Sequence, residues 1–353
     1  MGKIVDQNMI VPGKVEKEDL VWYDAKQAPF TVYGLCDPAH SFRRLPEDFP
    51  ILSGFGEECT GGRIRFATDS PYIAIHARLK PDCFPTIMSP CGVSGIDLYR
   101  VEADQTETFV NTFRLPTVES AYGEYEGCLS LPKENREYVL YLPVFMPVLD
   151  CKIGISGLSS LSKGTPYRVG EKPVVFYGSS ITHGAAASRP GNAYDAIICQ
   201  RLGVNRLNFG FSGNAKGEPV MAEYIARQDM LAFVLDYDHN TPSPEHLKAT
   251  HFPFYETVRK AHPQVPILMV TAPVPVLTEA FRARRRIIEE SYEKAVAAGD
   301  RNVAFVDGSR LLDGPLKQSC TVDGCHPNDL GFYRMARGIG NVLAGMLGLP
   351  EIL

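Results

Sequence analysis

Three side chains of this sequence have the types needed for nucleophilic acyl transfer: Ser180, Asp323 and His326. Ser180 lies in a glycine-containing turn, 177–184, directly after an apolar run, and Asp323 and His326 are three residues apart near the C-terminus. A serine hydroxyl becomes a nucleophile when a histidine removes its proton, and a carboxylate can hold that histidine in the required tautomer. The pattern predicts a Ser-His-Asp hydrolase with Ser180 as nucleophile, His326 as base and Asp323 as the group that orients it.

Each of these residues also has a simpler explanation. A Gly-Ser-Ser turn is typical of a helix N-cap, which would give Ser179 or Ser180 a purely structural role. Ser179 is in addition the alternative nucleophile. In the C-terminal segment, Asp323 could cap a turn while His326 is a solvated surface residue. The hydrolase hypothesis therefore requires that the two segments meet in the fold.

A metal site is a further alternative for the C-terminal segment. Cys320, Cys325 and His326 are close in sequence and have side chains that bind zinc. Cys325 and His326 are adjacent, however, so their side chains leave the backbone in different directions, and no second ligand pair accompanies them. The sequence therefore favours a hydrolase that uses neither a metal nor an organic cofactor.

The pattern of the C-terminal half predicts the elements that position these residues. Short apolar strands are predicted at 174–177, 206–209, 231–235, 266–270 and 303–306, and helices at 192–202, 218–228, 244–262, 278–298 and 329–346. Strands that alternate with helices indicate a parallel sheet with helices on both faces. Ligands of such domains bind at the carboxyl ends of the strands, where Ser180 is expected. We predict a three-layer α/β/α domain with a five-stranded parallel sheet.

The N-terminal half has a different pattern. Polar and apolar residues alternate with a period of two, and turn residues separate the runs, at 63–68, 72–79, 95–101, 107–113, 136–142 and 151–155. This pattern predicts an antiparallel β-sandwich of the jelly-roll type. A polar stretch at 159–166 marks the transition, so the predicted domains are 1–165 and 166–353.

Composition narrows the class of protein. A chain of 353 residues exceeds the usual size of a single core, and its net charge of −5 gives no reason to expect binding to nucleic acid or to an anionic membrane. The N-terminus lacks the apolar core of a signal peptide, and no apolar run reaches the length of a membrane span. Nine cysteines without CxxC spacing are typical of reduced thiols. We expect a cytoplasmic protein and leave its oligomeric state open, with a homo-oligomer as one alternative.

The segments around these residues resemble the conserved blocks of the SGNH (GDSL-type) hydrolases. Residues 178–181 (Gly-Ser-Ser-Ile) resemble the first block, with Ser179 where many members have aspartate. Residues 208–214 resemble the second block, whose glycine supplies an oxyanion N–H, here Gly213. Asp323 and His326 match the fifth block. The resemblance implies that the backbone N–H groups of Ser180 and Gly213 bind the oxyanion.

The third block departs from the family pattern. Residues 235–240 (Leu-Asp-Tyr-Asp-His-Asn) lie where this block belongs, after the third strand, but lack its usual Gly-x-Asn-Asp ending. The resemblance assigns the oxyanion side chain to Asn240, the only asparagine there. A strict register would place Asp238 at that position instead, where an ionised carboxylate would repel the oxyanion.

The resemblance extends to one branch of this superfamily. Residues 94–99 (Ser-Gly-Ile-Asp-Leu-Tyr) resemble the Gly-x-Asp-Leu-Tyr motif of a β-sandwich domain that precedes SGNH domains in bacterial proteins. Members of the superfamily are esterases, often acting on acetylated sugars, and some are acyltransferases. The resemblance implies a serine esterase for short, acetyl-type esters of a carbohydrate or small molecule. Acyl transfer through the same acyl-enzyme, and a non-catalytic carbohydrate-binding protein, are the alternatives.

Polar residues in the predicted βα loops are candidates for substrate binding. His183 follows the nucleophile closely, Arg189 could bind a carboxylate or sugar hydroxyls or form a loop salt bridge, and His239 precedes Asn240. The arginines between 282 and 286 are interpreted as a solvated helix face because glutamates accompany them at helical spacing.

Overall fold

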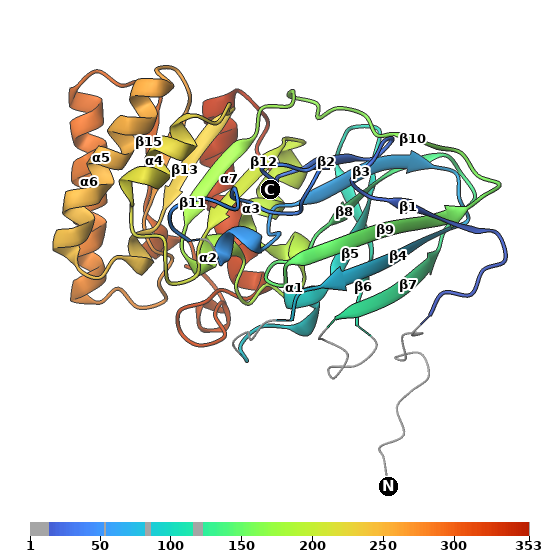
Figure 1. Ribbon diagram of the computed structural model, residues 1–353. Helices are drawn as coiled ribbons and strands as arrows, with labels where there is room; N and C mark the ends of the chain where they lie inside the picture. Colours follow the sequence, from blue (N-terminus) through green and yellow to red (C-terminus); the bar gives the residue numbers. More distant parts are fainter. Residues whose placement is uncertain (1–13, 53, 82–85, 116–122, 353) are drawn as a thin grey trace, which may run out of the picture. The chain divides into compact units, whose positions relative to one another are not determined.

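The computed structural model describes residues 14–52, 54–81, 86–115 and 123–352 (Figure 1). The chain forms two compact units. The N-terminal unit comprises the described residues up to Pro166 together with the short segment Ser188–Pro190, and the C-terminal unit comprises Tyr167–Ala187 and the described residues from Gly191 onward. None of the helices in the described ranges is both long enough and apolar enough to span a membrane.

The N-terminal unit contains two antiparallel sheets, as the alternating sequence pattern predicts. The first has the order β1-β9-β4-β7, with β1 Leu20–Asp24, β9 Val148–Ser156, β4 Tyr72–Leu79 and β7 Glu124–Ser130. The second has the order β10-β3-β8-β5-β6, with β10 Leu161–Lys163, β3 Arg63–Thr68, β8 Arg136–Tyr141, β5 Ile96–Val101 and β6 Glu107–Phe113, and β2 Thr31–Tyr33 pairs with β3. The described part of this unit also contains the short helices η2 Phe55–Glu57 and α1 Pro90–Ser94. In β4 the alternating residues Ile73, Ile75, Ala77 and Leu79 are apolar and buried, and they contribute to the core of the sandwich.

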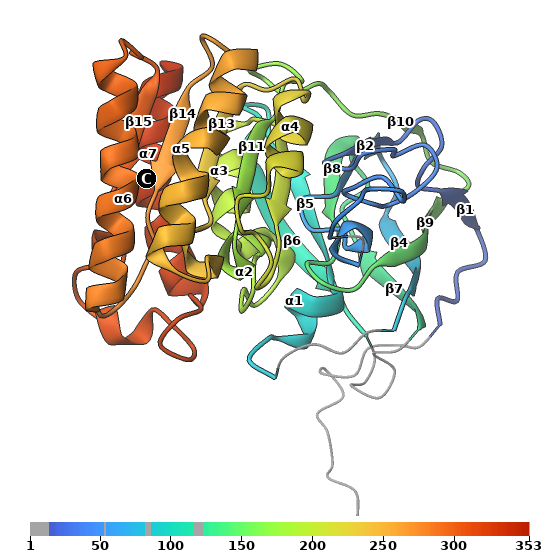
Figure 2. The ribbon, with the colours of Figure 1, turned by 60° about the vertical axis from the view of Figure 1, so that its left-hand side comes forward.

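The C-terminal unit is built on a five-stranded parallel sheet, which confirms the predicted α/β architecture. Its order is β12-β11-β13-β14-β15, with β11 Val174–Gly178, β12 Arg206–Gly210, β13 Ala232–Asp236, β14 Ile267–Val270 and β15 Val303–Val306. The helices are α2 Ser180–His183, α3 Tyr194–Leu202, α4 Pro219–Ala226, α5 Pro244–Ala261, α6 Glu279–Ala297 and α7 Asp329–Leu347. Helices α3 and α7 pack together on one face of the sheet, and α4, α5 and α6 form a second group on the other (Figures 1 and 2). The central strands β11 and β13 are consequently buried along their whole length.

The register of the sheet aligns the ends of its three central strands. Gly178, the last residue of β11, pairs with Gly210 at the end of β12 and with Asp236 at the end of β13. The strands are parallel, so the segments that follow these three residues leave the sheet at the same edge. This edge is where the first, second and third sequence blocks meet.

Candidate functional site

The turn after β11 exposes Ser180 and buries Ser179. Ser179 is 1% exposed, and its hydroxyl accepts a hydrogen bond from the Ile181 N–H at 3.2 Å, so it is the N-cap of α2. Ser180, the first residue of this single helical turn, is half-buried. The turn ends at Gly184, whose φ of 103° is a left-handed conformation that favours glycine. Capping by Ser179 leaves Ser180 as the serine whose hydroxyl is available.

Two glycines let α2 approach the strand ends closely. A Cβ on Gly178 would lie 2.0 Å from the Thr182 hydroxyl oxygen and 2.2 Å from the Asp236 carbonyl oxygen. A Cβ on Gly210 would lie 2.1 Å from the His183 backbone nitrogen. Neither position can accept a larger residue without moving backbone atoms, so these glycines fix the height of the turn above the sheet.

The C-terminal loop brings a histidine and a carboxylate to this turn. The Ser180 Oγ and the His326 Nε2 are 2.9 Å apart, and the His326 Nδ1 lies 2.7 Å from the Asp323 Oδ2. The other Asp323 oxygen accepts the backbone N–H groups of Cys325 at 2.9 Å and His326 at 2.7 Å. Three residues separated by up to 146 positions are thereby joined in one hydrogen-bonded series.

Electrostatics favour an ionised carboxylate at Asp323. Partial burial raises the pKa of its carboxyl group, but hydrogen bonds from the His326 ring and from the backbone N–H groups of His326 and Cys325 lower it by more. The net pKa lies below the ordinary value of an aspartate. A charged Asp323 can stabilise an imidazolium on His326.

The hydrogen bonds of His326 and Cys320 are relevant to the alternative of a zinc site. Both ring nitrogens of His326 are engaged, one by Ser180 and one by Asp323. The Cys320 thiol is buried and donates to the Leu316 carbonyl at 3.5 Å. Across the described ranges, no three histidine, cysteine or acidic side chains are grouped so that they could hold a metal ion.

The backbone N–H groups of Ser180 and Gly213 are available to donate hydrogen bonds to an anionic oxygen. Gly213 follows β12 and has a φ of 69°, with open space where a Cβ would be. Among the described residues, no acceptor faces the N–H of Gly213 or that of Ser180. The neighbouring Ser212 hydroxyl lies 3.0 Å from the His183 Nδ1, which anchors this loop to α2.

The third block forms a single 3-10 turn, η4, at Asp238–Asn240. The Asn240 carboxamide donates to the Phe211 carbonyl at 2.9 Å and so lies beside the loop that carries Gly213. Asp238 is 1% exposed, and its Oδ2 accepts the Ala272 N–H at 3.0 Å. Burial raises the pKa of Asp238 to about 6. Its carboxyl group is therefore directed at the segment after β14, and Asn240 is the third-block residue directed at the second block.

The predicted substrate-contacting residues lie in unlike environments. His183 is completely buried, so a substrate has no access to its ring in this structure. His239 lies near His326, with its Nδ1 4.0 Å from the Cys325 sulfur, and its Nε2 is buried without a partner among the described residues. Burial, and then the charges of His326 and Arg284, lower the pKa of His239 to about 4.

Arg189 forms the loop salt bridge that was one of its two predicted interpretations. Within the N-terminal unit, to which 188–190 belong, its guanidinium donates to the Asp97 Oδ2 at 3.0 Å and to the Tyr99 hydroxyl. It also lies 3.8 Å from the centre of the Phe109 ring. Asp97 and Tyr99 are the acidic and aromatic residues of the Gly-x-Asp-Leu-Tyr motif, so this motif contains the binding site for Arg189.

Sequence reasoning missed a buried network that includes Thr182, two residues after Ser180. The Asp236 Oδ2 accepts hydrogen bonds from the Tyr194 hydroxyl at 3.1 Å and from the Thr182 hydroxyl at 3.3 Å. Burial, reinforced by the charge of Asp238, raises the pKa of Asp236 well above that of an ordinary aspartate. No local pattern marks these residues, because they lie on β13, α2 and α3, and only the register of the sheet joins them.

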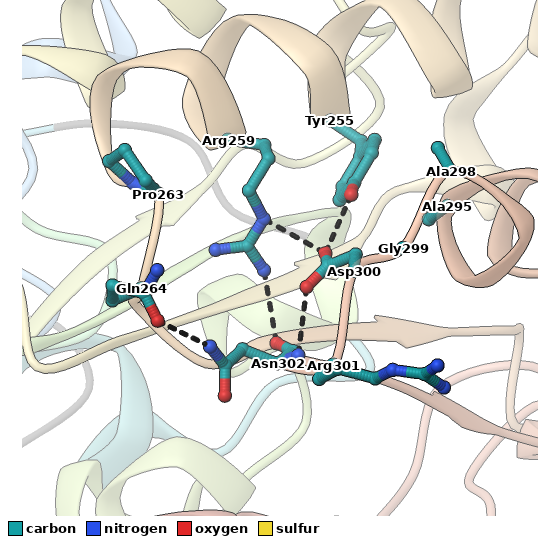
Figure 3. Close-up of a pocket in the computed structure, with 10 residues that line it drawn as sticks. All are labelled: Tyr255, Arg259, Pro263, Gln264, Ala295, Ala298, Gly299, Asp300, Arg301 and Asn302. Carbon is teal, nitrogen blue, oxygen red and sulfur yellow. Dashed lines mark hydrogen bonds and ion pairs between the residues drawn. The ribbon is translucent and has the colours of Figure 1, made fainter.

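A separate hollow of about 370 Å³ lies beside the amino ends of β14 and β15, whereas Ser180 follows the carboxyl end of β11 (Figure 3). Its central feature is Asp300, whose carboxylate accepts hydrogen bonds from Tyr255 at 2.6 Å, from Arg259 at 2.9 Å and from the Asn302 N–H at 2.8 Å. Arg259 also donates to the Asn302 carbonyl at 3.0 Å. These groups satisfy one another, so the cluster joins the end of α5 to the start of β15 and has no part in the site at Ser180.

Comparison with known proteins places both parts of the chain in described families. Residues 171–344 match the model of the GDSL-like lipase/acylhydrolase family, and residues 20–161 match the Gly-x-Asp-Leu-Tyr model, which describes the N-terminus of SGNH-hydrolase-type esterases. Among proteins with curated descriptions, none matches this chain.

Solved structures resemble the chain over nearly its whole length. A GDSL-like lipase from Bacteroides ovatus ATCC 8483 has a TM-score of 0.84 and 28% identity, covering 95% of this chain and 100% of its own. A salicylyl-acyltransferase from a tetracycline biosynthetic pathway has a TM-score of 0.77 and 19% identity, covering 96% and 100%. An acetyl xylan esterase from the rumen bacterium Butyrivibrio proteoclasticus has a TM-score of 0.58 and 14% identity, covering 93% and 99%. At these identities, the last two show only that the fold is shared.

Proposed function

Because this chain belongs to the GDSL-like lipase/acylhydrolase family and has the N-terminal domain of SGNH-type esterases, we propose that it is a serine esterase. Its proposed substrates are esters of a carbohydrate alcohol with a short acyl group, acetyl above all. The observation that carries the proposal is the hydrogen-bonded series from Ser180 through His326 to Asp323. Each member has the chemistry that its place requires: a hydroxyl, an imidazole and a carboxylate.

The proposed reaction proceeds through an acyl-enzyme. The His326 Nε2 removes the proton from the Ser180 Oγ as this oxygen attacks the ester carbonyl carbon. The resulting oxyanion is received by the N–H groups of Ser180 and Gly213 and by the Asn240 carboxamide. His326 then gives its proton to the departing alcohol, and the acyl group remains on Ser180. Water, deprotonated by His326, attacks this ester; His326 then returns the proton to the Ser180 Oγ as the acyl–oxygen bond breaks, which releases the acid and restores the serine.

Asp323 has the remaining role in this scheme. Its Oδ2 accepts the Nδ1 proton of His326, which keeps the Nε2 unprotonated and aimed at Ser180. The low pKa of the Asp323 carboxyl keeps it charged through the cycle, so that it stabilises the imidazolium formed at each proton transfer.

The proposed substrate class draws on the fold and on a polar residue near His326. An acetyl xylan esterase has this fold, so the architecture is compatible with an acetylated glycan. The half-buried His239 is a polar residue near His326, whereas His183 and Arg189 are engaged within the protein. A salicylyl-acyltransferase has the fold as well, so transfer of the acyl group to a bound alcohol in place of water is the second candidate.

A substrate series tests the proposal. We expect kcat/KM on p-nitrophenyl esters to be highest for acetyl and to fall through butyryl, octanoyl and palmitoyl, with acetate released from acetylated oligosaccharides. Ser180→Ala is the matched inactive control. A maximum at octanoyl or beyond, with no acetate from any sugar, would contradict the carbohydrate assignment. Conversion of an added alcohol to its ester in preference to hydrolysis would favour the acyltransferase.

A further inference from the structure

The four arginines near the start of α6 do not form one solvated face. The side chains of Arg282 and Arg286 are 53% and 64% exposed, and both pair with Glu279. Arg285 is bound to Asp307 at 2.9 Å. Arg284 alone in this run is directed at the third block: its Nη1 donates to the Asp238 carbonyl at 2.9 Å and to the Thr241 hydroxyl.

Arg284 contacts the Asp238 carbonyl, which is the acceptor of the hydrogen bond that closes η4. The Asp238 carbonyl also accepts the Thr241 N–H at 3.3 Å and the Thr241 hydroxyl at 2.9 Å, and these two bonds end the turn. On the other side, the Ala272 N–H holds the Asp238 carboxyl group at 3.0 Å. A turn of three residues has little stability of its own, so its shape depends on these external bonds.

Asn240 is the last residue of that turn. Its backbone N–H bonds to the Tyr237 carbonyl at 3.0 Å, and its carboxamide donates to the Phe211 carbonyl at 2.9 Å. The Phe211 carbonyl also accepts the N–H groups of Asn214 and Ala215, which close the loop around Gly213. Hydrogen bonds therefore hold both ends of η4: Arg284 binds the carbonyl of its first residue, Asp238, and the carboxamide of its last residue, Asn240, binds the loop of the second block.

We propose that Arg284 is a positioning residue, which holds η4 closed and thereby aims the Asn240 carboxamide at the oxyanion. The inference rests on the proposed function, because it requires Asn240 to act as an oxyanion donor. A guanidinium suits the role: its rigid, planar group of donors can bond to two oxygens at once, which a lysine ammonium does with less geometric definition. Displacement of a catalytic group by about 1 Å can cost a factor of roughly 10² in rate.

A double-mutant cycle with an acetyl ester tests this role. We expect Arg284→Met to lower kcat by about 10- to 100-fold with KM changed less than about 2-fold, since the lost contact serves the transition state. Asn240→Ala should lower kcat by roughly 10²–10³. The double variant should be no slower than Asn240→Ala alone, because Arg284 acts through that side chain. Arg286→Met, on the exposed side of the same helix, is the control and should leave kcat unchanged.

Three results would overturn the inference: an unchanged kcat in Arg284→Met, a kcat loss in the double variant equal to the product of the single losses, or the same loss in Arg286→Met. Arg284→Lys keeps a donor and serves if the methionine variant does not fold; partial recovery of kcat at unchanged KM supports positioning. If Asn240→Ala is fully active while Ser180→Ala is dead, the oxyanion assignment fails, and this inference with it.

A readout independent of turnover separates these failures from failure of the proposed function. Backbone amide hydrogen exchange of 238–241 should be faster in Arg284→Met than in wild type and unchanged in Arg286→Met. Wild-type protein that hydrolyses no ester would refute the proposed function, while faster exchange would still support the contact between Arg284 and η4. Equal exchange in all three proteins would overturn the inference.

Discussion

The turn that carries Ser180 and the loop that carries His326 are built in opposite ways. The sheet determines the position of the turn. A Cβ on Gly178 or on Gly210, at the ends of two strands, would lie within 2.2 Å of atoms of the turn, and the capping Ser179 is 1% exposed. The loop is set locally, since the exposed Asp323 binds both the ring and the backbone N–H of His326, each at 2.7 Å. Substitutions of the two glycines should therefore act mainly on stability, and substitutions of Asp323 or His326 mainly on activity.

The largest effect is expected in the loop. Asp323→Asn should lower kcat by roughly 10⁴, because a carboxamide can donate to the His326 Nδ1 and so favour the wrong tautomer. The free energy of unfolding should change by less than about 1 kcal/mol, since the residue is exposed. Steady-state kinetics and urea unfolding measure the two quantities. Asp313→Asn, an exposed acid paired with Lys317, is the control. A variant that keeps its activity but unfolds more easily would reverse the comparison.

The next effect is expected in the turn. Gly210→Ala would place a Cβ 2.1 Å from the backbone nitrogen and 2.5 Å from the Cα of His183, and backbone atoms cannot move aside cheaply. We expect a loss of about 3 kcal/mol in the free energy of unfolding, measured in urea. Gly345→Ala, in α7 with nothing near the new methyl group, should be stabilising by up to about 1 kcal/mol. Equal stability of the two variants would show that the sheet does not fix the turn.

The smallest effect is expected at a buried histidine of α5, His251. His251 is 1% exposed and packs flat on Tyr237, and its two ring nitrogens have no partner among the described residues. Burial lowers its pKa to about 3, whereas the unfolded chain takes up the proton near pH 6.5. The native state should thus lose stability as pH falls below about 6.5, by about 2 kcal/mol at pH 5.

Replacing this histidine isolates that contribution. His251→Phe should be at least as stable as wild type at pH 7.5, because it removes two unpaired polar atoms. It should also lose about 2 kcal/mol less than wild type between pH 7.5 and pH 5, by urea unfolding at both values. The exposed His40 provides a control in His40→Phe. An identical loss in wild type and His251→Phe would mean that the interior beside β13 is accessible to protons.

How far the sequence predicted the molecule depends on the range of each interaction. Alternation and apolar runs predicted the antiparallel sheets of the N-terminal unit and the parallel sheet of the C-terminal unit, because they record which face of a strand is buried. The partners of Arg189 could not be predicted, since Asp97 is 92 residues away and only the fold joins them. The helical run 282–286 gave no indication that Arg284 points inward, because spacing alone does not define how a helix is rotated against its neighbours. The oxyanion role of Asn240 stays a prediction.

Covalent labelling tests the central claim most directly, since it needs no knowledge of the substrate. A fluorophosphonate probe reacts with a serine that an adjacent base activates. The account predicts a single phosphonylated peptide with the label on Ser180, its loss in Ser180→Ala, and its slow formation in Asp323→Asn. A label on Ser179, or labelling that chelation by EDTA abolishes and zinc restores, would contradict it.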